Sequence, residues 1–258
     1  MRDPRSIVIT GASSGLGAAL AETYAGTGVH LALTGRHAER LAAVATACRQ
    51  RGAEVTTATL EVTDREAMSL WLREIDRQQP IDLVIANAGI SAGTGGGGES
   101  EAQTRTIFAV NLEGVLNTIL PVLPALGARG GGQLALMSSL AGFRGFPGAP
   151  AYCASKAAVR VWGEALRGQL RSTGIEVSVI CPGFVESPMT TRNDFPMPLL
   201  MPAPRAARII RRGLDRGRAR IAFPWPLYAM AWLLATLPLW LTDPLLGRLP
   251  KKKSAPSG

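Results

Sequence analysis

Residues 6–17 have the sequence SIVITGASSGLG, in which a short apolar run passes directly into a loop with three glycines. The run 6–10 is rich in β-branched residues and predicts a buried strand, and residues 18–26 predict a helix. Glycines at such a junction permit a tight turn and let the backbone approach a pyrophosphate, whose negative charge the helix N-terminus attracts. The stretch therefore predicts the first strand-helix unit of a dinucleotide-binding domain.

The rest of the chain alternates short apolar runs with longer amphipathic stretches. Strands are predicted over 29–34, 54–60, 81–87, 133–138, 175–181 and 221–223, and helices over 38–51, 64–78, 101–126, 150–171 and 205–216. This alternation implies βαβ units. We therefore expect one Rossmann-type, doubly wound α/β domain over residues 1–223, with a seven-stranded, mostly parallel sheet and helices on both faces. An apolar extension over 224–258 and a flexible glycine-rich loop over 89–98 are also expected.

The composition excludes a disordered polymer, because 47% of the 258 residues are apolar and only 18% are charged. The formal charge of +9 is unevenly distributed: residues 1–204 carry 17 basic and 17 acidic side chains, whereas residues 205–258 carry 11 basic and 2 acidic. The whole positive excess therefore lies near the C-terminal end.

The cysteines and histidines predict neither a disulfide framework nor a metal site. Cys48, Cys153 and Cys181 are widely spaced without a CxxC pair, and His30 and His37 form no ligand motif. The N-terminal residues contain no apolar signal segment before the first strand. We expect a cytoplasmic protein.

The GxxxGxG spacing of residues 11–17 and several later motifs resemble the short-chain dehydrogenase/reductase family. The later motifs, in the family's order, are Asn87-Ala88-Gly89, Asn111, Ser139, Tyr152-x-x-x-Lys156 and Pro182-Gly183. The resemblance covers about residues 5–223 and implies a nicotinamide-dependent oxidoreductase. It also implies a homodimer or homotetramer that pairs through the helices over 101–126 and 150–171.

The same resemblance implies which residues bind the cofactor: Gly11, Ser13, Ser14, Gly15, Leu16, Gly17, Arg36, Glu61, Val62, Asn87, Ala88, Gly89, Tyr152, Lys156, Pro182, Gly183 and Val185. Arg36 follows the second strand, where an acidic residue would bind the ribose 2′-hydroxyl of NAD, and its guanidinium suits a 2′-phosphate instead. We therefore predict NADP(H), unless Arg36 only begins the solvated face of the next helix. Glu61 stands where a shorter aspartate is common in the family.

Tyr152 and Lys156 are four residues apart and share one face of the predicted helix. A tyrosine with a pKa of about 10 is a poor base at neutral pH, and a nearby ammonium group favours its phenolate. By resemblance, Tyr152 exchanges a proton with the carbonyl oxygen, and Lys156 also holds the nicotinamide ribose. Ser139, which its spacing favours over Ser138, binds the substrate oxygen, and Asn111 supports a water-linked proton path.

By the same resemblance, residues 186–204 form a lid over the substrate. The lid is unusually apolar, and its larger side chains either line a deformable pocket or pack on the helices below. They are Met189, Phe195, Met197, Leu199, Leu200 and Met201.

Residues 221–242 contain no charged side chain, and the 22-residue run includes Trp225, Tyr228, Trp232 and Trp240. That length reaches the roughly 20 residues of a membrane-spanning helix, but three prolines and the overlap with a strand argue against a span. Aromatic rings with basic neighbours are typical of the headgroup boundary. We expect residues 224–253 to make peripheral contact with the cytoplasmic face of a membrane. The alternatives are packing on the domain, closure of the substrate pocket or a dimer contact.

Together these features predict an NADP(H)-dependent oxidoreductase that interconverts a ketone and a secondary alcohol, with reduction of a lipophilic carbonyl as the favoured direction. A sugar-nucleotide epimerase or dehydratase is disfavoured by the glycine spacing and the lack of a large substrate domain. A non-catalytic, cofactor-sensing protein docked on a membrane is disfavoured by the complete catalytic set. Nucleic-acid binding is disfavoured because the aromatic residues lie in aliphatic sequence.

Overall fold

The computed structural model describes residues 3–91, 98–191, 193 and 195–247. Its sheet has seven strands in the order β3-β2-β1-β4-β5-β6-β7, and every neighbouring pair is parallel. The expected doubly wound α/β fold is confirmed, with a sheet that is wholly and not mostly parallel. The strands are β1 (Ser6–Thr10), β2 (His30–Gly35), β3 (Glu54–Thr59), β4 (Leu83–Ala86), β5 (Gly132–Met137), β6 (Ile175–Pro182) and β7 (Arg220–Phe223).

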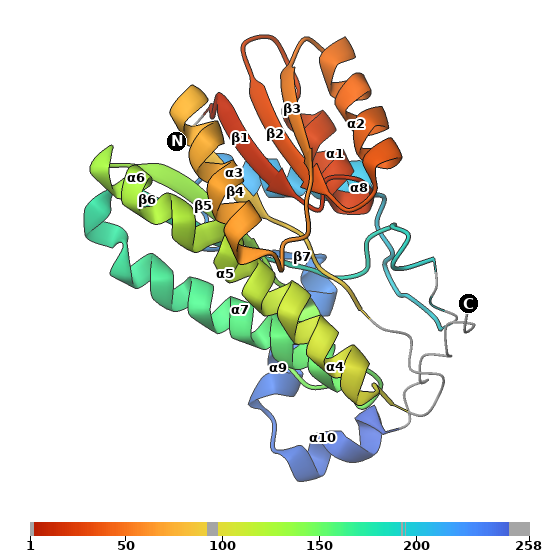
Figure 1. Ribbon diagram of the computed structural model, residues 1–258. Helices are drawn as coiled ribbons and strands as arrows, with labels where there is room; N and C mark the ends of the chain where they lie inside the picture. The colour runs from red at the N-terminus through yellow and green to blue at the C-terminus, as the bar shows by residue number, and fades with distance from the viewer. Residues whose placement is uncertain (1–2, 92–97, 192, 194, 248–258) are drawn as a thin grey trace.

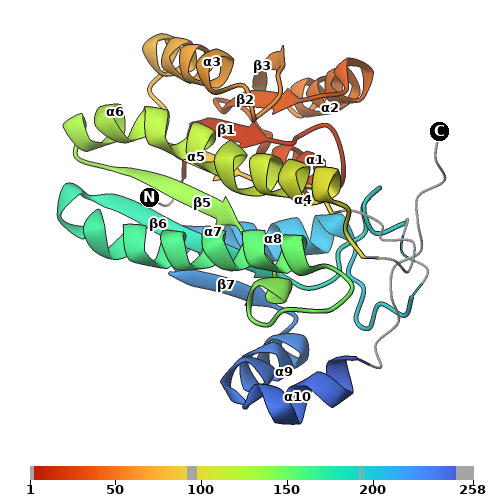
Figure 2. The same ribbon diagram turned by 60° about the horizontal axis from the view of Figure 1, so that its bottom comes forward.

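Helices cover both faces of the sheet (Figures 1 and 2). Successive residues of β1 point to opposite faces. Ile7 and Ile9 pack with one helical layer and Val8 with the other. The first layer contains α1 (Gly15–Tyr24), α2 (Ala38–Gln50) and α8 (Ala203–Asp215), and the second contains α3 (Arg65–Gln78), the helical stretch 101–128 and α7 (Pro150–Gln169).

The sequence predicts one helix over 101–126, and the stretch 101–128 is helical throughout, but its geometry changes along its length. It comprises α4 (Glu101–Phe108), a π-helical turn η1 (Ala109–Glu113), α5 (Gly114–Ile119), the 3-10 turn η2 (Leu120–Val122) and α6 (Leu123–Ala128). In the part of the chain that the structure describes, this is the one helical stretch long and apolar enough to cross a membrane. Ile107, Val115, Ile119 and Leu126 are buried in the core, so we assign it as a core helix.

The extension after β7 forms α9 (Trp225–Thr236) and α10 (Leu239–Leu246) beside the β7 edge of the sheet (Figure 2). With 12 residues, α9 is well short of the roughly 20 residues that span a bilayer. Arg220 attaches α9 to the domain by donating to the hydroxyl of Tyr228 at 3.1 Å. Arg144, in the loop after η3 (Leu140–Gly142), donates to Thr242 and Asp243 of α10 at 3.0 and 2.6 Å. The extension therefore packs on the domain.

Three sequence predictions include residues outside the described ranges, and one of them is the lid over 186–204, which includes residues 192 and 194. The glycine-rich loop over 89–98 includes residues 92–97, and the predicted membrane-contacting segment includes residues 248–253.

Candidate active site

The sheet reverses its strand order between β1 and β4, and ligands of such sheets bind in the crevice at the carboxyl ends of these strands. A cavity of about 670 Å³ lies there. Its lining includes the glycine loop, Arg36, Tyr152 and, from the C-terminal extension, Leu234. One cavity thus joins the predicted cofactor residues to the predicted catalytic residues.

The glycine loop is held against the end of β4 by hydrogen bonds. Asn87 Nδ2 donates to the carbonyls of Thr10 and Gly11 at 2.9 and 3.3 Å. A Cβ on Gly17 would lie 2.2 Å from the carbonyl oxygen of Gly11, so only glycine lets α1 start this close to the loop. Ser14 gives α1 no side-chain cap within the described residues. The amides at this helix N-terminus therefore suit a phosphate group.

Beyond the end of β2 the cavity is lined by basic side chains. Arg36 is joined there by His37 and Arg40 from the start of α2. Sequence analysis missed Arg40, although its spacing of four residues from Arg36 was a signal. Glu61 and Val62 also line this end, and Val62 is held by a hydrogen bond from Asn117 Nδ2 to its carbonyl at 3.0 Å.

Ser139, Tyr152 and Lys156 converge on the cavity from the end of β5 and from α7. Tyr152 is hydrogen-bonded to the side chain of Ser139. Lys156 Nζ donates to the carbonyl of Met137 at 2.9 Å and lies 5.8 Å from the centroid of the Tyr152 ring. The hydroxyl of Ser138 is used elsewhere, because it donates to the backbone carbonyl of Lys156 at 2.7 Å. This geometry supports Ser139 as the serine beside the tyrosine.

Glu99 is a residue of this site that sequence analysis did not single out. Its carboxylate accepts hydrogen bonds from the backbone N–H groups of Ala151 and Tyr152 at 2.5 and 3.4 Å, at the first turn of α7. A carboxylate is favourable at a helix N-terminus. The contact joins residues more than 50 positions apart, so no local pattern signalled it.

Asn111 lies in the π-helical turn and is fully buried. Its amide donates to the carbonyl of Ile90 at 2.9 Å and to Ser155 Oγ at 3.0 Å, and its Oδ1 accepts from the N–H of Ile90 at 2.7 Å. A Cβ on Gly89 would lie 3.2 Å from Asn111 Oδ1 and 3.1 Å from Lys156 Nζ. Asn111 therefore supports the backbone next to Gly89, close to Lys156, and its side chain lies behind the cavity wall.

Burial shifts the pKa values of Tyr152 and Lys156 in directions that favour their neutral forms. It raises the pKa of Tyr152, against the opposing effect of the hydrogen bond with Ser139. It also lowers the pKa of Lys156 to about 8. At neutral pH, Tyr152 is consequently protonated and Lys156 retains most of its positive charge.

The lowered pKa of Lys156 predicts a loss of activity in alkaline solution. As the pH rises through about 8, the ammonium group that stabilises the phenolate of Tyr152 disappears, so kcat/KM for the cofactor is expected to fall above about pH 8. This titration does not unfold the protein: a lysine with a lowered folded-state pKa destabilises the fold at low pH, and that effect is relieved as the pH rises. Circular dichroism across the same pH range checks the fold, and a flat kcat/KM profile up to about pH 10 would contradict the assignment.

Residues of the predicted lid and of the C-terminal extension also line the cavity. Met189 and Phe195 face the cavity, and Met201 is buried in the core, where its N–H donates to the carbonyl of Phe184 at 3.0 Å. Leu199 and Leu200 are exposed. Each alternative for the lid thus holds for some of its residues. The remaining wall comes from α9 and α10, through Leu227, Met230, Ala231, Leu234 and Leu246.

The C-terminal end of β6 and the residues directly after it contribute the last of the predicted cofactor-binding residues. Pro182, Gly183 and Val185 line the cavity, and the N–H of Gly183 donates to the carbonyl of Phe223 at 2.7 Å. Among the described residues, no group of three or more His, Cys, Asp or Glu side chains could hold a metal ion. The three cysteines are buried, and none of them forms a disulfide among the described residues.

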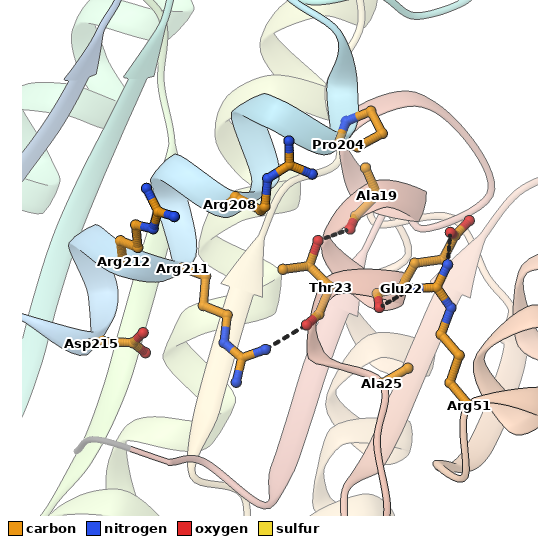
Figure 3. Close-up of a pocket in the computed structure, with 10 residues that line it drawn as sticks. All are labelled: Ala19, Glu22, Thr23, Ala25, Arg51, Pro204, Arg208, Arg211, Arg212 and Asp215. Atoms are coloured by element: carbon orange, nitrogen blue, oxygen red, sulfur yellow. Dashed lines mark hydrogen bonds and ion pairs between the residues drawn. The ribbon is translucent and has the colours of Figure 1, made fainter.

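A second cavity, of about 580 Å³, lies between α1 and α8 (Figure 3). Four arginines line it, and two of them are engaged: Arg51 pairs with Glu22 at 2.9 Å, and Arg211 donates to the carbonyl of Thr23 at 2.6 Å. Its lining contains none of the motif residues, so we place the chemistry in the larger cavity.

Comparisons with known proteins agree with this geometry. The family model for short chain dehydrogenases matches residues 5–195. A Myxococcus xanthus (strain DK1622) protein named "Uncharacterized oxidoreductase" is 39% identical over 246 residues, which cover 95% of this chain and 97% of that protein. A short chain dehydrogenase/reductase from Burkholderia phymatum in complex with NAD has a TM-score of 0.82 at 24% identity, covering 100% of this chain and 99% of its own. A short-chain dehydrogenase from Sphingobium yanoikuyae in complex with NADPH has a TM-score of 0.79 at 26% identity, covering 97% of this chain and 98% of its own.

Proposed function

The chain belongs to the short-chain dehydrogenase/reductase family and is an oxidoreductase, and we propose that it reduces lipophilic ketones to secondary alcohols with NADPH. The observation that carries the proposal is the convergence of Ser139, Tyr152 and Lys156 on a cavity that also contains the glycine loop. The apolar side chains at the other end of the same cavity supply the substrate preference.

The proposed proton transfer uses Ser139, Tyr152 and Lys156, which lie close together in the cavity. The substrate carbonyl accepts hydrogen bonds from the hydroxyls of Ser139 and Tyr152, which places its oxygen beside the proton that Tyr152 donates. The glycine loop, Arg36 and Lys156 would hold NADPH, which would supply the hydride when bound. The ammonium of Lys156 stabilises the phenolate that remains, because opposite charges at short range favour the ionised form. In the reverse direction the same phenolate removes the proton.

The preference for NADPH rests on the basic end of the cavity. Arg36 and Arg40 line the region beyond β2, where the adenosine ribose of a cofactor bound at the glycine loop would lie. A guanidinium forms strong, charge-assisted hydrogen bonds to a phosphate. Since the similar solved structures include both an NAD and an NADPH complex, the direct test is the ratio of kcat/KM with NADPH to that with NADH. A higher value with NADH would refute the cofactor assignment.

The substrate preference predicts a dependence on chain length. Each buried methylene contributes about 0.8 kcal/mol, so kcat/KM is expected to rise about fourfold per added CH₂ in a series of 2-alkanones until the apolar end of the cavity is filled. The steady-state rate of NADPH oxidation, followed by the absorbance of the reduced nicotinamide, measures the series. A series in which kcat/KM does not change with chain length would show that Phe195, Leu227 and Leu234 do not bind the substrate.

We also propose that copies of the chain pair through the outer surfaces of α4–α6 and α7, as the family resemblance implies. Leu120 and Val161 are exposed apolar side chains on these helices, with 49% and 55% of their surface accessible. Analytical ultracentrifugation of the protein and of a Val161→Lys variant tests the pairing.

A further inference from the structure

We propose that the outer face of α9 and α10 docks on an anionic membrane, so that the wall of the active-site cavity is in contact with the bilayer that supplies the substrate. This inference rests on the proposed function, since a membrane is a source of lipophilic ketones. The docking face is defined by Trp225, Met230, Trp232, Leu233, Leu239, Trp240 and Leu241.

Exposed apolar side chains are concentrated on this face. It carries seven of the twelve large apolar side chains that are exposed in the described part of the chain. Trp225 and Trp240 are the most exposed of them, with 74% and 76% of their surface accessible. Clustered apolar surface of this kind marks an interaction site, whereas single exposed residues do not.

The opposite side of the same helices is also apolar, because it lines the cavity. Leu227, Ala231 and Leu234 of α9 face the cavity, and Met230 both lines it and is 51% exposed. The cavity therefore reaches the docking face at Met230. A helix that is apolar on all sides requires apolar surroundings on all sides, and the domain provides them on one side only.

The charges in the sequence of α10 and the residues after it favour lipid headgroups as the partner. Asp243 is the only acidic residue after Asp215, and Arg144 pairs with it at 2.6 Å. The sequence that follows α10 contains Arg248, Lys251, Lys252 and Lys253. A basic stretch next to an apolar helix is attracted to the negative surface of an anionic leaflet.

The element lengths indicate how the membrane is contacted. Helices α9 and α10 have 12 and 8 residues, so neither can span the hydrocarbon core. Tryptophan rings are enriched at the headgroup level of membranes, so Trp225, Trp232 and Trp240 favour a position of these two helices at the interface. The proposed membrane contact is thus peripheral, and neither helix crosses the bilayer.

The test uses the full-length protein with sedimented vesicles of phosphatidylcholine, with and without phosphatidylglycerol. We expect binding to the anionic vesicles, a blue shift of tryptophan emission, and weaker binding in high salt. The double variant Trp225→Gln/Trp240→Gln is expected to bind at least tenfold more weakly, since it removes the two most exposed indole rings of the docking face. Neither tryptophan lines the cavity, so kcat with a short, water-soluble ketone is expected to stay at the wild-type value.

Leu70→Gln is the matched control, because it removes an apolar side chain that is 62% exposed on α3, away from the docking face. This variant should bind vesicles as the wild type does. Recovery of wild-type protein in the supernatant of anionic vesicles would overturn the proposal. So would a change from dimer to monomer in the tryptophan variant without any vesicle binding, since the face would then join two copies. Vesicle binding without turnover of any ketone would refute the proposed function and leave the docking face intact.

Discussion

Replacing Tyr152 with phenylalanine is expected to lower kcat for ketone reduction by about 10²- to 10⁴-fold, the usual contribution of a general acid. The substitution keeps the ring near Lys156 and removes only the hydroxyl that is hydrogen-bonded to Ser139. NADPH affinity is expected to remain within about twofold of the wild type, because the phosphate-binding loop and Lys156 are unchanged. Steady-state kinetics and quenching of intrinsic fluorescence by NADPH measure the two quantities separately.

Tyr24→Phe is the matched control for this variant. The hydroxyl of Tyr24 is buried on α1 and accepts or donates no hydrogen bond within the described residues. Its removal should leave kcat unchanged and stability equal or slightly higher, because an unsatisfied buried polar group destabilises the fold. Equal turnover in the two variants would exclude Tyr152 as the proton donor.

The sheet could be predicted from local sequence because each strand and its helix carry their own signals. Residues 6–10 form β1 as expected, and Asp64 caps α3 by accepting a hydrogen bond from the N–H of Ala67 at 3.0 Å. The order of the motifs predicted that Ser139 and Tyr152 meet. Ser139 follows the end of β5 and Tyr152 lies at the start of α7, and both positions are at the same edge of the sheet. Local pattern and short connections are sufficient for such features.

Contacts between segments that are distant in the sequence could not be predicted from local patterns. Met201 forms a β-bridge with Val185 and is buried in the core, whereas Met189, which belongs to the same apolar segment, lines the cavity. Likewise, the cap that Glu99 gives to α7 depends on a loop conformation that no spacing encodes. From the sequence alone, the apolar residues of α9 fit a membrane-contacting surface and a pocket wall equally well. The structure gives them two faces, one toward the cavity and one exposed.

Replacing Arg36 with aspartate is expected to lower the NADPH-to-NADH ratio of kcat/KM by about 10²-fold or more. Loss of a charge-assisted hydrogen bond to the 2′-phosphate removes about 1.5–3 kcal/mol, and the new carboxylate repels that phosphate. The same carboxylate can accept a hydrogen bond from the ribose 2′-hydroxyl of NADH. Activity with NADH should therefore be kept or increased while activity with NADPH falls.

Arg73→Asp controls for the change in net charge, because Arg73 is exposed on α3 and does not line the cavity. If the ratio falls equally in both variants, long-range charge and not a contact at Arg36 sets the preference. A contact persists at high ionic strength, whereas attraction between separated surface charges is screened beyond about 8 Å at physiological salt. Measuring both variants at low and high salt thus separates recognition of the 2′-phosphate from general attraction of a negatively charged cofactor. Arg40, on the same wall, should show a smaller effect of the same sign, since Arg36 would still supply a guanidinium.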